Sequence, residues 1–175
     1  MGVDRDREFG DYYTSRADRM RGAAYLMCGD WHRAEDVVQT AFVRLYLGWH
    51  RVNAEGAIDQ YVRQIITRSL VDESRRPWRR ERAVAPDELP EATVNDPPPE
   101  ERMVLVHALA QVPARQRVTL VLRFFEDLSV EETAAMLGVS VGTVKSQTSR
   151  GLDALRAALS AANVSLPSIN GGSPR

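Results

Sequence analysis

The chain has 175 residues, enough for one domain or two small ones, and its 43% share of hydrophobic residues is sufficient for a buried core. A net charge of -1 does not by itself indicate or exclude a nucleic-acid partner, because an acidic segment can offset a basic surface elsewhere. The single cysteine, Cys28, excludes an internal disulfide, and three scattered histidines do not suggest a zinc site, so we expect no metal or cofactor. A lone cysteine suits a reducing compartment, so we expect a cytoplasmic protein. No stretch reaches the roughly 18 apolar residues of a membrane span, which predicts no membrane insertion.

Two amphipathic helices are predicted first. Apolar residues at steps of three and four predict a helix over residues 8–28, which Gly29 ends. Asp30 is a suitable cap for a second helix, which has a broad apolar face up to Trp49. Its polar edge is either a solvated surface or a docking site, and it contains Asp36, Gln39, Thr40 and Arg44.

A loop and a basic helix follow. Residues 51–57 contain Asn and Gly and predict a loop, after which apolar spacing from Ile58 to Leu70 predicts a third helix. Seven arginines against three acids occupy residues 63–82, with Tyr61 and Trp78 close by. Cations beside aromatic rings suit single-stranded or melted nucleic acid, since cations follow the backbone while rings stack on bases. A solvated, arginine-rich helix end is the alternative.

An acidic, proline-rich segment separates this half from the next. Residues 83–101 hold six acids, five prolines and no basic residue. Such a segment buries too little apolar surface to offset the entropy of ordering, so it predicts a flexible linker between two separate units. The fold class is therefore all-α, with two small helical domains.

The second half ends in a helix-turn-helix pattern. Two helices separated by Pro113 precede Ser129, whose capping box with Glu132 starts a third, and Gly138 ends it. Ser140 caps a fourth helix with an apolar stripe of Val141, Val144, Thr148, Leu152, Leu155 and Leu159. The other face carries small polar and basic residues, which suit entry into the DNA major groove. An αα-hairpin with a solvated face is the alternative, and residues 161–175 are expected to be a disordered tail.

Catalytic patterns are missing from the sequence. It contains no phosphate-binding Gly-x-x-x-x-Gly-Lys loop, no His-x-x-x-His pair and no Gly-x-Ser-x-Gly elbow. We therefore expect a protein that is not an enzyme and has no catalytic residue.

This order of segments resembles the extracytoplasmic function sigma factors of the sigma-70 family. The stretch from Ala34 to Tyr46, AEDVVQTAFVRLY, looks like the family's polymerase-binding helix, and Leu128 to Ser146, LSVEETAAMLGVSVGTVKS, looks like its promoter-reading motif. The resemblance covers about residues 8–160, and residues 141–150 are most similar to the actinobacterial group called SigE-like.

The resemblance implies a sigma factor that binds core RNA polymerase, recognises the minus-10 and minus-35 elements of promoter DNA and helps to melt it. It implies sigma region 2 at residues 8–80, a linker at 81–100 and sigma region 4 at 101–160. It also implies an anti-sigma factor as a partner, and no small-molecule substrate.

The resemblance assigns roles to individual residues. Core polymerase binding falls to Asp36, Gln39 and Thr40, and minus-10 binding to Asn53, Arg63, Arg68, Arg75 and Arg76. Minus-35 binding falls to Arg123, Ser140, Thr143, Lys145, Ser146, Ser149 and Arg150.

The chain departs from the family pattern within the promoter-reading helix. Gln147, Thr148 and Ser149 replace residues common in the family, so we expect the promoter preference to reside there. The rival interpretations are a stand-alone helix-turn-helix regulator, an enzyme acting on nucleic acid, and a protein-docking bundle. A stand-alone regulator would usually dimerise to match two half-sites, and the sequence offers no additional segment for that purpose.

Overall fold

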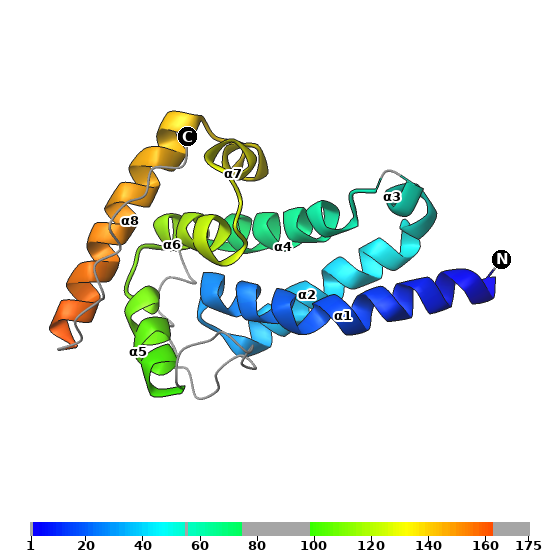
Figure 1. Ribbon diagram of the computed structural model, residues 1–175, viewed down its shortest axis with the longest axis horizontal. Coiled ribbons are helices and arrows are strands. Elements are labelled where there is room, and N and C mark those ends of the chain that lie inside the picture. Colours follow the sequence, from blue (N-terminus) through cyan, green and yellow to red (C-terminus); the bar gives the residue numbers. More distant parts are fainter. Residues whose placement is uncertain (1, 55, 75–98, 163–175) are drawn as a thin grey trace.

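The computed structural model describes residues 2–54, 56–74 and 99–162, which are helical with short turns and contain no strand (Figure 1). This confirms the all-α prediction. The first half contains α1 (Gly2–Cys28), α2 (Trp31–Leu47), α3 (Trp49–Ala54) and α4 (Ile58–Ser74). The second half contains α5 (Pro99–Ala110), α6 (Ala114–Leu120), a π-helical segment (Val121–Phe125), α7 (Val130–Leu137) and α8 (Val141–Ala161). Residues 83–98 of the predicted linker, Trp78 and the predicted tail beyond residue 162 lie outside the described residues.

Helix α1 begins six residues before its predicted start at Glu8. The apolar periodicity that predicted it starts at Phe9, whereas the earlier turns are held by polar contacts. Arg5 Nη2 donates to the hydroxyl of Tyr46 at 2.6 Å, and that hydroxyl donates to Asp6 Oδ1 at 2.8 Å. At the other end, Gly29 takes a left-handed φ of 71°, which a residue with a side chain rarely adopts. The predicted end of α1 is confirmed.

The junction of α1 and α2 is filled by aromatic rings. Phe9 contacts Phe42, Tyr46 and Trp49 edge to face, with ring centroids 5.1–6.3 Å apart. Edge-to-face contacts between rings stabilise packing beyond the area they bury. Asp30 caps α2 as predicted, because its side chain accepts a hydrogen bond from the backbone N–H of Arg33.

The predicted loop over residues 51–57 is wrong for its first half, because α3 continues to Ala54. Trp49 and Val52, three residues apart, are both buried against the first half's core, which requires the helical spacing. Asn and Gly favoured a loop locally, but the burial of Trp49 and Val52 decided the conformation. A turn follows at Gly56, whose φ is 66°.

The helix-turn-helix has the predicted caps. Ser129 accepts from the N–H of Glu132 at 3.0 Å, and the Glu132 carboxylate accepts from the N–H of Ser129 at 2.7 Å. These backbone and side-chain hydrogen bonds hold the pKa of Glu132 below its ordinary value. Gly138 takes a left-handed φ of 64° between the two helices. The stripe predicted for α8 is confirmed at the buried Val144 and Leu159, whereas Val141 is exposed.

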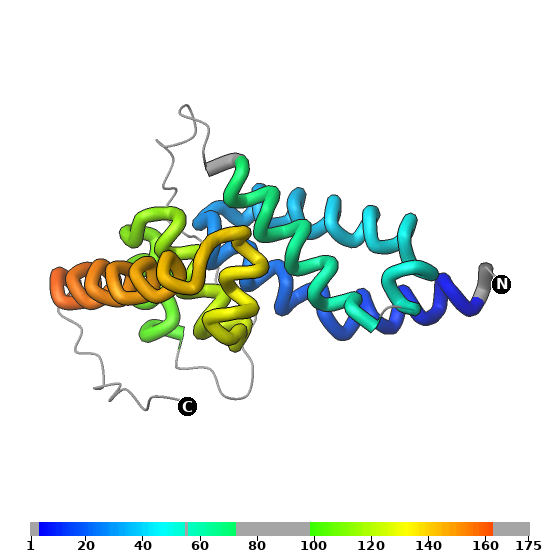
Figure 2. Tube along the Cα trace, turned by 90° about the horizontal axis from the view of Figure 1, so that it is seen from above, coloured from blue at the N-terminus to red at the C-terminus, as the bar shows by residue number. Residues whose placement is uncertain are grey.

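The two halves pack against each other rather than standing apart. Helix α1 contacts α5 and α6, and α4 contacts α6 and α7, as the proximity of α4 to α7 in Figure 2 shows. Arg117 of α6 donates from Nε to the carbonyl of Met27 at the end of α1, at 2.9 Å. Helix α5 already includes Pro99 and Glu100, which the sequence assigned to the linker; proline suits the first turn of a helix because it has no N–H to leave unpaired.

Candidate nucleic-acid interface

The first three turns of α8 present most of the predicted DNA-reading side chains to solvent. Lys145, Ser146, Ser149 and Arg150 are exposed, whereas Thr143 is half-buried. The Ser140 side chain accepts from the N–H of Thr143 at 3.1 Å, and the two hydroxyls lie 2.9 Å apart. Ser140 therefore serves as the cap of α8.

A groove of about 420 Å³ lies along one side of this helix. Three cationic side chains line it, Arg123 from the π-helical segment and Lys145 and Arg156 from α8, together with Ser149. Lys145, Ser149 and Arg156 recur at steps of four and seven, so they share one helix face. The groove thus brings together three predicted residues and adds Arg156, which the same spacing in the sequence could have indicated.

Arg123 has a structural contact as well as a place in the groove. Its Nη1 donates to the carbonyl of Leu128 at 2.5 Å, which ties the π-helical segment to the turn before α7. Its guanidinium also lies 5.8 Å from the ring centre of Phe124. Arg123 is therefore fixed in position where it lines the groove.

The predicted specificity tripeptide is only partly available to DNA. Gln147 turns towards α6, where its Oε1 accepts from the hydroxyl of the buried Thr119 at 2.7 Å. The hydroxyl of Thr148 donates to the carbonyl of Val144 within the same helix, at 2.8 Å. Of the three residues, only Ser149 is exposed, so the prediction that all three set the promoter preference is not supported by their orientation.

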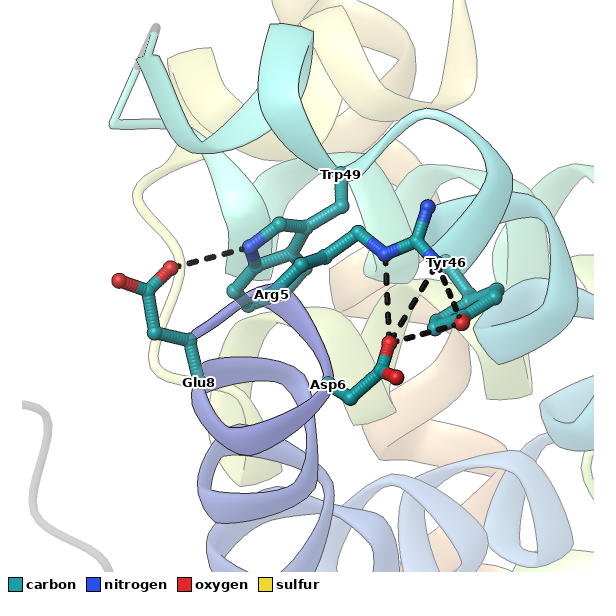
Figure 3. Close-up of polar contacts among 5 residues, drawn as sticks. All are labelled: Arg5, Asp6, Glu8, Tyr46 and Trp49. Carbon is teal, nitrogen blue, oxygen red and sulfur yellow. Dashed lines mark hydrogen bonds and ion pairs between the residues drawn. The ribbon is translucent and has the colours of Figure 1, made fainter. Parts of the chain in front are cut away.

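The first turns of α1 hold α3 in place (Figure 3). Glu8 Oε2 accepts from the indole N–H of Trp49 at 3.2 Å, which gives the single polar atom of this buried side chain a partner. The same oxygen is 3.5 Å from Nδ2 of Asn53, a predicted minus-10 residue at the end of α3. Next to them, the hydroxyl of Tyr46 and then the guanidinium of Arg5 lower the pKa of Asp6.

Of the predicted minus-10 residues, the structure describes Asn53, Arg63 and Arg68, which lie on two different helices. Asn53 is exposed on α3 and Arg68 is exposed on α4. Arg63 instead faces the second half of the chain, where its Nε lies 2.6 Å from Oε2 of Glu126. Arg75 and Arg76 lie outside the described residues.

The polar edge of α2 forms a continuous exposed stripe with two apolar residues. Asp36, Gln39 and Thr40 are exposed, as predicted for a docking face. Further along the same face, the side chains of Val43 and Leu47 are 59% and 79% exposed. Their spacing of 36, 40, 43 and 47 keeps them on one helix face, a signal already present in the sequence. Large exposed apolar side chains beside polar ones are typical of protein interfaces.

The part of the chain that the structure describes contains no candidate metal site. Within it, no group of three or more His, Cys, Asp or Glu side chains lies close enough together to hold a metal ion. In the same part of the chain, no helix has the length and apolar character needed to span a membrane.

The chain matches two family models in order, Sigma-70 region 2 over residues 12–80 and Sigma-70 region 4 over residues 98–155. It is 36% identical to the RNA polymerase sigma-E factor of Streptomyces avermitilis over 85% of this chain and 83% of that protein. The chain belongs to the extracytoplasmic function sigma factors of the sigma-70 family. As a sigma factor, it directs RNA polymerase to promoters and takes part in the initiation of transcription.

Two further comparisons extend this result. The sigma factor is 27% identical to SigW, an extracytoplasmic function sigma factor of Bacillus subtilis, over 85% of this chain and 87% of that protein. Its fold is similar to the sigma factor RpoE of Bartonella quintana in a co-crystal structure with the anti-sigma factor NepR. That likeness has a TM-score of 0.68 at 20% identity and covers 88% of this chain and 98% of the other.

Proposed function

We propose that the two halves of this sigma factor divide promoter recognition between them, without catalysing a reaction and within the cytoplasm. The first half docks on core RNA polymerase and holds the opened minus-10 strand, and the second half reads the minus-35 element. The observation that carries this proposal is the exposed polar and basic face of α8, which follows a capped α7 and a left-handed glycine turn.

For the second half, we propose two groups of contacts to minus-35 DNA. Lys145, Arg123 and Arg156 neutralise backbone phosphates from the groove, since they converge on one concave surface. Ser146 and Arg150 lie further around the exposed side of α8 and read base edges, together with Ser149. Ser140 and Thr143 contribute chiefly through the helix cap, with their hydroxyls close to a phosphate.

For polymerase binding, we propose the stripe on α2 as the docking face. Asp36, Gln39 and Thr40 supply polar contacts to the largest subunit of the polymerase, as family resemblance implies, while Val43 and Leu47 supply apolar area. Interfaces commonly combine apolar anchors with a polar rim, and this stripe has both.

For the minus-10 strand, we propose that Asn53 and Arg68 contact it together with Arg63, Arg75 and Arg76. The contact of Asn53 with Glu8 steadies the end of α3, so that less ordering is needed when a base binds. An anti-sigma factor is a further proposed partner, because the similar solved structure holds one.

Run-off transcription with purified core RNA polymerase tests the proposal. The sigma factor should yield transcripts that depend on a promoter, and no transcript from any genomic fragment would contradict it. The variant Asp36→Ala/Gln39→Ala should lose core binding while circular dichroism stays unchanged. Asp11→Ala, which removes an exposed acid from α1, is the matched control and should bind core normally.

A further inference from the structure

The carboxylate of Glu126 lies between two arginines of the other half of the chain. Arg63 Nε of α4 is 2.6 Å from Oε2, and Arg19 Nε of α1 is 3.7 Å from Oε1. Arg19 Nη2 also donates to the carbonyl of Phe125 at 2.6 Å, and its guanidinium lies 5.0 Å from the Phe125 ring centre. The Glu126 side chain is only 6% exposed, so this contact is part of the packed interface.

The two arginines form a site for an anion. They come from different helices and place two positive charges around a single negative one, so without an anion between them they would repel each other. The planar guanidinium fork binds carboxylate and phosphate oxygens with the same geometry. Glu126 is therefore the ligand that the folded chain itself supplies to a site that also fits a phosphate.

The backbone around Glu126 connects this site to the promoter-reading half. Glu126 directly follows the π-helical segment, and π-helical turns occur frequently at functional sites. The next residue, Asp127, has a φ of 55°, a left-handed conformation uncommon for residues other than glycine. The same segment carries Arg123, which lines the groove beside α8. Separating the second half of the chain, with its π-helical segment, from α1 and α4 would therefore withdraw Glu126 from the arginines.

We propose that Arg19 and Arg63 bind a backbone phosphate of the opened promoter strand, and that Glu126 occupies their site while the two halves are packed together. The proposal rests on the proposed function of the first half and adds Arg19 of α1 to its strand-binding surface. It also makes separation of the halves a condition for strand binding at Arg63, because one guanidinium pair does not hold both anions.

Binding of a fluorescent oligothymidine strand to the full chain, followed by anisotropy at several salt concentrations, tests this site. Glu126→Gln should bind at least about threefold more tightly than the native chain, because the competing carboxylate charge is gone. Its affinity should also depend more steeply on salt, by roughly one unit of the log-log slope, because additional phosphates are neutralised. Glu131→Gln removes an equal charge from an exposed position on α7 and should leave both quantities unchanged.

Second substitutions locate the effect. Adding Arg19→Gln or Arg63→Gln to Glu126→Gln should abolish the gain in affinity. Circular dichroism verifies that each variant is folded. Glu126→Asp, which withdraws the carboxylate by one methylene group, should also bind the strand more tightly than the native chain. The site assignment is overturned by unchanged affinity in folded Glu126→Gln, or by a gain that survives loss of either arginine.

Two further measurements separate the alternatives. Polyglutamate and unlabelled nucleic acid of equal charge are compared as competitors of the labelled oligonucleotide. If polyglutamate displaces the oligonucleotide as effectively as the nucleic acid does, the site binds acidic peptide and the phosphate assignment is overturned. Run-off transcription is measured in parallel on the native chain. Promoter-dependent transcripts together with unchanged strand binding by Glu126→Gln would refute only this inference, whereas tighter strand binding without any transcript would refute the proposed function and leave the anion site standing.

Discussion

Leu47 offers the sharpest test of the polymerase-docking face. Its side chain is 79% exposed at the end of α2, so almost all of its apolar surface is available for burial by a partner. Burying a leucine side chain contributes about 1.5–3 kcal/mol, so Leu47→Ala should lose about 2 kcal/mol of binding free energy. This loss corresponds to a roughly 30-fold higher Kd for core RNA polymerase.

The assay is titration of fluorescently labelled protein with core polymerase, accompanied by thermal unfolding. Because Leu47 makes little contact with its own core, its substitution should change the free energy of unfolding by less than about 0.5 kcal/mol. Val139→Ala, an exposed apolar position in the turn before α8, is the control and should bind core normally. An increase in Kd of less than about threefold for Leu47→Ala would refute Leu47 as a docking contact, because it would mean that this side chain stays exposed to solvent in the complex.

Three other predictions concern the second half. Glu132→Ala should lower stability at neutral pH but not in strong acid. Hydrogen bonds to Ser129 lower the pKa of the Glu132 carboxyl, so the carboxylate stabilises the fold above its unfolded-state pKa and loses this effect as pH falls through its folded-state pKa. Thermal unfolding measured across this pH range checks the prediction. Gly142→Ala should raise the free energy of unfolding in urea by up to about 1 kcal/mol, because alanine has the higher helix propensity. Gly151→Ala should have a free energy of unfolding about 1–3 kcal/mol lower than that of Gly142→Ala, because its Cβ would lie 3.1 Å from the Leu120 side chain of α6. Equal free energies of unfolding for the two variants would contradict this packing. Arg150→Ala should weaken promoter affinity by about 1–3 kcal/mol if it reads a base, with core binding unchanged, and unchanged promoter affinity would remove it from the reading surface.

The elements predicted best from the sequence are those stabilised by local hydrogen bonds. The caps at Asp30, Ser129 and Ser140 and the turn at Gly138 each depend on groups within four residues. The conformation of α3 was missed because its helical form depends on burial of Trp49 against a distant helix. Local composition contains no information about that contact.

The candidate site was predicted unevenly for the same reason. The exposed face of α8 follows from helical spacing, and the same spacing places Val43 and Leu47 on the face of α2 that carries Asp36 and Thr40. The orientation of Gln147 depends on Thr119, twenty-eight residues away. Its inward position is therefore not readable from the recognition helix alone.

Apart from α3 and the first turns of α1, the sequence by itself determined the helices, the caps at Asp30, Ser129 and Ser140, the order of the two halves and the sigma-factor family. These features depend on local spacing and on motifs that are contiguous in the chain. Only the tertiary structure decided which charges are available to DNA. Glu126 and Arg63 are sixty-three residues apart and on opposite sides of the predicted linker, yet they form an ion pair within the packed interface. Burial of a carboxylate requires a nearby cation, and which cation meets it depends on how the two halves pack.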